Sequence, residues 1–363
     1  MALTNTISLL ILLLGLIFNP IAYAQSEQDD EDFSFDDAPV SNEIKYPQWF
    51  KNSFLDLSED IEEAKQNNKK GIIVYFGQKH CAYCLALMKN DFGQEDIATY
   101  TKKYFDVVPI NIWGSKEVTL PNGKVVTEKE FAIKEKADLT PSLVFYNSEG
   151  KRIFMLRGYY PPYKFRAALE YIAEEYYKQE SFANYIRRAD PPPKFEISDL
   201  NHEEFFMPEP YALSRKHFKA DKPLLVFFEQ RDCYACDVLH SESTHHEDTR
   251  KLLKYFDIVQ IDINADTPVL TPDGQKLTAK QWAIQLGLFY TPTIIAFDES
   301  GNEILRIDSV AHIYRLQSFM EFIASKVYKT SPNFISWRFD VLFGGQKLPV
   351  LDKLNEDPMM NDE

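Results

Sequence analysis

Four cysteines form two pairs with the same spacing. Cys81 and Cys84 are separated by two residues, as are Cys233 and Cys236. Each pair comes after an apolar run, and a helix is expected to begin at the pair, so the first sulfur lies at a helix N-terminus. There the helix dipole and the unpaired backbone N–H groups favour the thiolate, which is the reactive form of cysteine. The second sulfur lies one helical turn further on, within reach to close a disulfide. The spacing therefore predicts two reversible thiol–disulfide centres.

Strands are predicted before each cysteine pair and again about 60 residues after it (141 − 81 = 60; 292 − 233 = 59). Residues 72–76 and 224–228 are continuous apolar runs, which are typical of strands buried on both faces. Thr140-Pro141 and Thr291-Pro292 stand directly before two later strands. One Cys-x-x-Cys motif is weak evidence alone, but the same succession found twice is specific.

The second half of the chain repeats the order of the first. Cys233 follows Cys81 by 152 residues (233 − 81 = 152), and Pro292 follows Pro141 by 151 (292 − 141 = 151). A repeat of this length is a whole domain rather than a solenoid unit. The predicted segments are a signal peptide (1–24), an acidic flexible leader (25–45), domain 1 (46–187), a proline-rich linker (188–205), domain 2 (206–335) and a C-terminal tail (336–363).

Both copies resemble thioredoxin-fold domains, specifically the SoxW-like branch of periplasmic thiol–disulfide oxidoreductases. The resemblance covers residues 46–187 and 206–335 and includes the insert with Pro121-Asn122-Gly123 in one copy and Pro272-Asp273-Gly274 in the other. The residues that carry it most specifically are Cys81, Cys84, Thr140, Pro141, Cys233, Cys236, Thr291 and Pro292. It implies an α/β fold of two tandem thioredoxin-like domains, each a mixed central sheet flanked by helices.

The resemblance also implies a chemistry. The first cysteine of each pair attacks a partner disulfide as the thiolate, and the second cysteine resolves the mixed disulfide. The Thr-Pro bond is cis in this family, and its loop lies against the cysteine pair. Thr140-Pro141 and Thr291-Pro292 would then expose backbone groups that pair with an extended substrate segment. No cofactor is expected.

Three residues near the pairs are expected to modulate them. His80 precedes Cys81 and would favour its thiolate if cationic, whereas Asp232 precedes Cys233 and would disfavour it, so we predict the lower thiol pKa for Cys81. Thioredoxins bury an aspartate six residues before the first cysteine, where this chain has Tyr75 and Phe227. In the second copy Glu229 could replace that proton acceptor or could be a solvated loop acid.

Composition narrows the class of protein. The net charge of −15 argues against nucleic-acid binding, which needs clustered Lys and Arg. Eight acidic residues and no basic ones lie in residues 25–43, which predicts a solvated spacer. All four cysteines belong to the two pairs, so none remains for structural cross-links.

The N-terminus predicts export. An apolar run from Ile7 to Phe18 precedes Ala22-Tyr23-Ala24, whose small residues suit cleavage. An uncleaved anchor is the alternative, because residues 1–6 contain no Lys or Arg. The expected location is the bacterial periplasm. The expected partners are protein thiol or disulfide clients and a membrane electron donor of the DsbD or CcdA kind, and the resemblance connects the protein with sulfur-compound oxidation.

The leading hypothesis is a reductase or isomerase of protein disulfides or protein-bound sulfur adducts. The spacing from Cys81 to Pro141 leaves no room for the large helical insertion of DsbA-type oxidases. One alternative is a tandem client-binding module or chaperone in which thiol chemistry is secondary. Another is a metal carrier that uses the cysteine pairs with His240, His245 and His246, although exposed histidines in a polar helix are usually surface residues.

Overall fold

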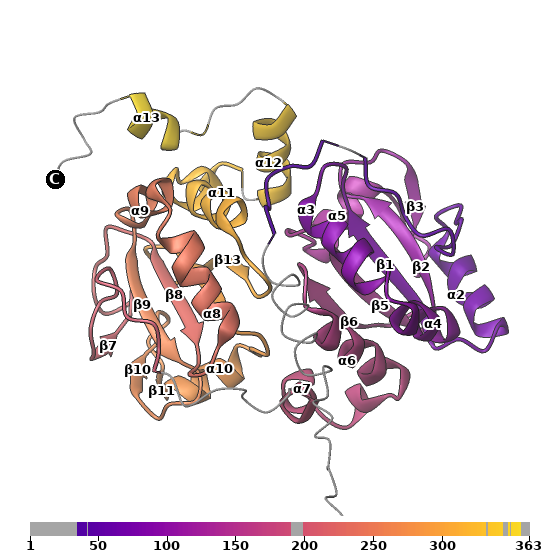
Figure 1. Cartoon of the computed structure of the whole chain (residues 1–363), viewed down its shortest axis with the longest axis horizontal. Helices are drawn as coiled ribbons and strands as arrows, with labels where there is room; N and C mark the ends of the chain where they lie inside the picture. Colours follow the sequence, from indigo (N-terminus) through magenta and orange to yellow (C-terminus); the bar gives the residue numbers. More distant parts are fainter. Residues whose placement is uncertain are drawn as a thin grey trace, which may run out of the picture.

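The computed structural model describes residues 35–41, 43–189, 199–331, 333–343, 348 and 350–356. The predicted signal peptide, the triple proline of the linker and the last seven residues of the tail, 357–363, lie outside the described residues. Two separate four-stranded sheets, each flanked by helices, form two domains joined in one chain (Figure 1). This is the α/β architecture that the sequence predicts.

The sheet of domain 1 has the strand order β2-β1-β5-β6. These strands are β2 (Phe105–Asn111), β1 (Gly71–Gly77), β5 (Ser142–Asn147) and β6 (Arg152–Arg157). Strand β1 runs parallel to β2 and antiparallel to β5, and all seven of its residues are buried. Ile73 and Tyr75 belong to one core cluster, and Ile72, Val74 and Phe76 belong to another. The continuous apolar run therefore reflects a strand covered on both faces.

Helices cover both faces of this sheet. They are α2 (Leu57–Gln66), α3 (Ala82–Ala86), a π-helical turn (Leu87–Asp91), α4 (Glu95–Tyr104), α5 (Glu128–Glu135), α6 (Pro162–Ala173), a 3₁₀ turn (Tyr176–Lys178) and α7 (Phe182–Ala189). A hairpin of β3 (Glu117–Thr119) and β4 (Val125–Thr127) leads into α5. Thr127 and Glu130 form a capping box at the start of α5. Asp56 is the N-cap of α2 and accepts from the backbone N–H of Ser58.

Domain 2 repeats this sheet in the order β13-β12-β8-β9. Its elements are β7 (Tyr211–Ala212), β8 (Leu224–Glu229), α8 (Tyr234–Val238), a π-helical turn (Leu239–Thr244), α9 (Glu247–Leu253), β9 (Asp257–Asp262), β10 (Pro268–Leu270), β11 (Lys276–Thr278), α10 (Ala279–Gln285), β12 (Thr293–Phe297), β13 (Glu303–Ile307), α11 (Ile313–Ala324) and a 3₁₀ turn (Val327–Lys329). Each strand of this sheet pairs as its counterpart does in domain 1. The internal duplication is thus one of complete domains.

The tail forms two further helices, α12 (Phe334–Phe343) and α13 (Leu351–Glu356). Phe334 and Trp337 are buried and pack on Phe322 of α11, with ring centroids 5.2 Å apart in both pairs. The start of α12 therefore packs on the second copy of the domain. None of the described helices has the length and apolar character to cross a bilayer.

The two domains contact each other through equivalent loops that follow β6 and β13, the edge strands that face each other in Figure 1. Arg157 forms an ion pair with Asp308 at 2.8 Å. The backbone N–H of Val310 donates to the carbonyl of Tyr159 at 3.1 Å, and the Tyr160 hydroxyl donates to the carbonyl of Asp308 at 2.7 Å. Contacts between equivalent positions are what a two-fold interface requires, so the copies pack about a pseudo-two-fold axis.

Candidate functional site

Each cysteine pair closes a disulfide at the start of a short helix. Cys81 bonds to Cys84 and Cys233 to Cys236, each with Cα atoms 5.2 Å apart. Cys81 is the N-cap of α3, and its Sγ accepts from the backbone N–H of Cys84 at 3.0 Å. Cys233 caps α8 in the same way, at 3.1 Å from the N–H of Cys236. The backbone donor that would stabilise a thiolate therefore already points at the first sulfur of each pair.

The two Thr-Pro loops lie against these sulfurs. Thr140–Pro141 and Thr291–Pro292 are both cis, as the resemblance implies. The Sγ of Cys81 is 3.3 Å from Thr140 Oγ1, and the Sγ of Cys233 is 3.6 Å from Thr291 Oγ1. The structure thus brings each sequence-predicted cysteine pair together with its sequence-predicted loop.

The residues before the first cysteines occupy matching turns. His80 and Asp232 both have left-handed backbone conformations, with φ of 60° and 54°. Histidine and aspartate are among the few residues enriched there. The Nδ1–H of His80 donates to the carbonyl of Val40 at 2.8 Å, which ties the first motif to the segment before domain 1.

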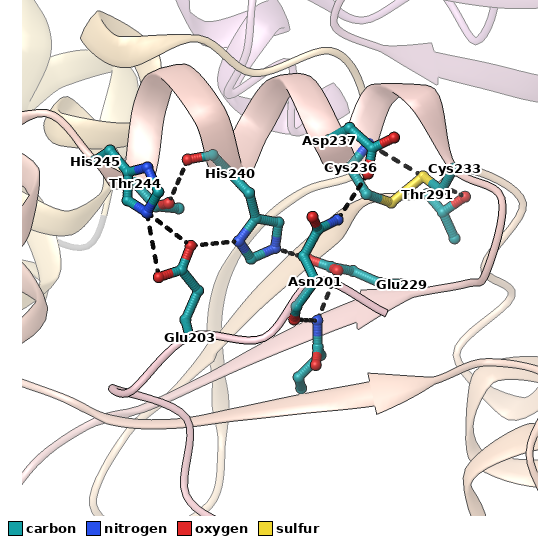
Figure 2. A network of polar contacts seen from close by, with 11 residues as sticks. Asn201, Glu203, Glu229, Cys233, Cys236, Asp237, His240, Thr244, His245 and Thr291 are labelled. Carbon is teal, nitrogen blue, oxygen red and sulfur yellow. Dashed lines mark hydrogen bonds and ion pairs between the residues drawn. A yellow bond between two sulfur atoms is a disulfide. The ribbon is translucent and has the colours of Figure 1, made fainter. Parts of the chain in front are cut away.

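A buried polar network lies beneath the second pair (Figure 2). Glu229 ends β8 and is fully buried. Its Oε1 lies 2.9 Å from Nε2 of His240, and its Oε2 accepts from Gln260 at 2.9 Å. The option that Glu229 is a solvated loop acid was therefore wrong. The surface assignment of His240 was also wrong, because this side chain is 3% exposed.

Two glutamates raise the pKa of His240 and so favour its charged form. Burial by itself lowers the pKa of His240, but hydrogen bonds and charge from Glu229 and then Glu203 outweigh burial and raise it above its ordinary value. Glu203 Oε1 lies 3.2 Å from His240 Nδ1 and 3.0 Å from His245 Nε2.

In the part of the chain that the structure describes, no three His, Cys, Asp or Glu side chains gather in a way that could hold a metal ion.

The first domain lacks this network because different residues stand at the equivalent places. Tyr75 of β1 lies opposite Pro109 of β2. At the equivalent place in domain 2, Phe227 of β8 lies opposite Gln260 of β9. Gly77 stands where Glu229 is in domain 2, and a Cβ there would overlap the hydroxyl of Tyr75. The two cysteine pairs are thus alike in backbone geometry and different in the groups beneath them.

All four cysteines are buried, but the tyrosines between them differ in exposure. Tyr83, between Cys81 and Cys84, is 5% exposed, whereas Tyr234, between Cys233 and Cys236, is 43% exposed. Tyr83 is buried because side chains of domain 2 cover its ring.

Arg315 of α11 provides that cover. Its guanidinium lies 3.3 Å from the centroid of the Tyr83 ring, and its Nη2 donates to the carbonyl of Thr140 at 2.7 Å. Sequence analysis did not find Arg315, because the contact arises only when the two copies are packed together.

The segment before domain 1 adds a second missed residue, Asp37. It is 5% exposed, although a solvated spacer was expected there. Its carboxylate accepts from the Tyr83 hydroxyl at 2.7 Å and from the backbone N–H groups of Tyr314 and Arg315, both at 2.8 Å. Asp37 therefore serves the N-terminus of α11 as a cap from a distant part of the chain.

A cysteine pair at a helix N-terminus beside a cis-proline loop, on a β-sheet of this order, defines the thioredoxin-fold class. The chain belongs to the thioredoxin-like domain family, whose pattern matches residues 57–173 and again 215–324. A comparison with curated proteins gives no match.

Among solved structures, the chain is similar to a thioredoxin-fold protein from Helicobacter pylori, at 24% identity over 38% of this chain and 98% of that one, with a TM-score of 0.31. It is also similar to a thioredoxin from Thermus thermophilus, at 21% identity over 32% of this chain and 83% of that one, with a TM-score of 0.26. A third structure is a disulphide isomerase from Xylella fastidiosa Temecula1, at 16% identity over 42% of this chain and 100% of that one, with a TM-score of 0.24.

Proposed function

We propose that this protein is an exported thiol–disulfide oxidoreductase that reduces or isomerises protein disulfides or protein-bound sulfur adducts. One observation carries the proposal: in each domain the first cysteine of a Cys-x-x-Cys pair caps a helix and lies beside the threonine of a cis-proline loop. A helix N-terminus lowers the pKa of a thiol, and the thiolate is the attacking species in disulfide exchange.

The reaction proceeds by two exchanges. The thiolate of Cys81 or Cys233 attacks one sulfur of the client disulfide, forms a mixed disulfide and releases the other client sulfur as a thiolate. The thiolate of Cys84 or Cys236 then attacks the first cysteine and releases the second client sulfur. The client gains two electrons and two protons, and the enzyme pair loses them as it becomes the disulfide.

Glu229 would serve the second half of this cycle in domain 2. Cys236 must lose its proton before it attacks, and Glu229 is the buried carboxylate beneath that pair (Figure 2). His240 and Gln260 hold its two oxygens, which keeps the side chain in place. General bases positioned in this way contribute typically 10²- to 10⁴-fold to a rate.

Export, the SoxW-like relationship and the supply of electrons rest on the sequence. The apolar run and the Ala22-Tyr23-Ala24 site support cleavage and release into the periplasm. A membrane carrier of the DsbD or CcdA kind would then re-reduce the pairs, which directs the protein toward reduction or isomerisation.

Reduction of insulin by dithiothreitol tests the activity. The wild type is expected to accelerate the appearance of turbidity, and the double variant Cys81→Ser/Cys233→Ser is expected to lose the acceleration. Equal rates with and without the first cysteines would support a client-binding module instead. The reduction potential of each pair then gives the direction, because a value near that of thioredoxin indicates a reductant and one near that of DsbA an oxidant.

A further inference from the structure

The first cysteine pair opens onto a cavity between the domains rather than onto a free surface groove. The cavity holds about 300 Å³, and its lining includes Cys81, Thr140 and His80 of domain 1, Arg315 and Arg338 of the second half of the chain, and Asp37. A volume near 300 Å³ is at the small end of the range for small-molecule sites. A cavity of this kind would admit a small molecule to Cys81.

An extended polypeptide meets an obstacle at the same place. The carbonyl of Thr140 precedes the cis-proline, where the backbone of a client segment would pair. In this structure it already accepts from Arg315 at 2.7 Å. Arg315 is buried and also donates to the carbonyl of Val310 at 3.0 Å, so α11 would have to withdraw before a client could use the groove.

The charges around the cavity favour an anion. Lys79, Arg315 and Arg338 line it, whereas Asp37 is the one carboxylate among its lining residues. Lys79 pairs with Glu43 at 3.0 Å, and the guanidinium of Arg338 lies 5.2 Å from the centroid of the Tyr314 ring. The surroundings of the second pair are more acidic, with Asp232 and Asp237 on either side of the motif and Glu229 beneath it.

We propose that the Cys81–Cys84 site reacts with small anionic disulfides, and that the Cys233–Cys236 site, whose Tyr234 is 43% exposed, is the one that reacts with proteins. This inference rests on the proposed redox function and gives the substrate class of the first site. Reduced Cys81 attacks one sulfur of a small disulfide R–S–S–R and releases one R–SH, and Cys84 then releases the second. The disulfide takes up two electrons and two protons, which the cysteine pair gives up.

Three disulfides of similar size and different charge test the proposal. They are 3,3′-dithiodipropionate, which is dianionic, bis(2-hydroxyethyl) disulfide, which is neutral, and cystamine, which is dicationic. Each probe is mixed with two variants in their reduced form. Cys233→Ser/Cys236→Ser keeps only the first pair, and Cys81→Ser/Cys84→Ser keeps only the second. Rates are measured under single-turnover conditions and divided by the rate of each probe with dithiothreitol, which removes intrinsic differences in reactivity.

The first pair is expected to prefer the dianion over the dication by about 10-fold or more, because the cavity lining carries three cationic side chains and one carboxylate, and an excess of one sign concentrates the opposite sign. Arg338→Gln is expected to reduce this preference by about 3-fold, and Arg338→Lys to retain it. Insulin is expected to oxidise the second pair about 10-fold faster than the first, because Arg315 occupies the Thr140 carbonyl.

The outcomes separate this inference from the proposed function. If the first pair reacts with all three probes at equal normalised rates, or prefers cystamine, the redox function stands and the anionic specificity is overturned. The same holds if both pairs share one preference, or if insulin oxidises the first pair as fast as the second. If neither pair reacts with any probe or with insulin, the proposed function itself fails.

Discussion

Arg157 and Asp308 occupy equivalent positions in the two domains (308 − 157 = 151) and bind each other across the interface at 2.8 Å. The same offset relates Arg315, which holds the Thr140 carbonyl, to Lys164, whose Nζ lies 5.1 Å from the centroid of the Tyr290 ring. The start of α6 in domain 1 therefore lies near the cis-proline loop of domain 2, and the start of α11 in domain 2 lies near the cis-proline loop of domain 1. The duplicated domains pack as two subunits of a symmetric dimer would, but with different side chains at each end.

The Arg157–Asp308 pair is expected to couple the domains. Its side chains are 31% and 10% exposed, so removal of one partner leaves a partly buried charge behind. Arg157→Ala or Asp308→Ala should each lower the free energy of unfolding by about 1–3 kcal/mol, between the values for exposed and for buried pairs. Urea denaturation of both variants and of the double variant measures the coupling. Fully additive losses would show that the two side chains do not stabilise each other.

Gly158 packs closely against Ser309 of the equivalent loop. It has a φ of +89°, and an added Cβ would lie 2.6 Å from Ser309 Cβ and would overlap the Ser309 hydroxyl. Gly123 has a similar φ of +77° with no atom within 4 Å of the added Cβ, so Gly123→Ala is a matched control. Gly123→Ala should cost about 1 kcal/mol of stability from the backbone alone. Gly158→Ala should cost at least about 1 kcal/mol more, since the interface must shift. Equal losses in urea denaturation would mean that the loops separate without cost.

Asp37 is expected to hold α11 over the first cysteine pair. Asp37→Ala removes the acceptor of two backbone N–H groups and of the Tyr83 hydroxyl, which should cost about 1–2 kcal/mol. With α11 less firmly held, reduced Cys81 should react faster with iodoacetamide in the variant that lacks the second pair. The exposed neighbour gives the control, because Asp36→Ala should change neither stability nor alkylation. An unchanged alkylation rate in Asp37→Ala would show that Asp37 does not control access to Cys81.

The features of the site that were predicted from sequence are local ones. Cys81 and Cys84 are three residues apart, so a helix start alone determines how their sulfurs meet, and the apolar run of 72–76 already requires a strand buried on both faces. Asp37 and Arg315 are 278 residues apart, and no local pattern links them. Their contact depends on how the two copies pack, which hydrophobic periodicity does not encode.

His240 is an intermediate case. It lies four residues after Cys236, and this i, i+4 spacing puts both side chains on one helix face, so its burial could have been inferred from the sequence. The wrong surface assignment came from its polar neighbours. A π-helical turn, Leu239–Thr244, carries it in the structure, and no composition rule predicts such a turn.

Glu229 is expected to speed the resolving step of domain 2 only. Glu229→Gln keeps a group of the same shape beneath the pair but removes the base, so release of a mixed disulfide by Cys236 should slow by about 100-fold or more at pH 7. The first pair should be unaffected, because Gly77 stands at the equivalent place. Stopped-flow decay of a mixed disulfide at each pair measures the rates. Glu203→Gln, on the other side of His240, is the matched control. Equal slowing by both variants would indicate a structural effect, and no slowing by Glu229→Gln would exclude it as the base.

His240 should make the stability of domain 2 depend on pH. Because its folded pKa is raised above the usual value of about 6.5, the cation stabilises the fold fully below that pH, and the contribution is lost as the pH rises through the raised pKa. His240→Gln should therefore lower the free energy of unfolding by about 2 kcal/mol at pH 6 and by less at pH 9, since part of the loss is that of an ion pair.

Urea denaturation of the wild type and of His240→Gln between pH 6 and pH 9 measures this difference. His245→Gln is the control: its side chain is 48% exposed and contacts the same Glu203, so it should cost at most about 1 kcal/mol at either pH. A loss at His240 that stays constant or grows toward pH 9 would mean that the imidazole is held in its neutral form. His240 would then hold Glu229 through a hydrogen bond rather than through an ion pair.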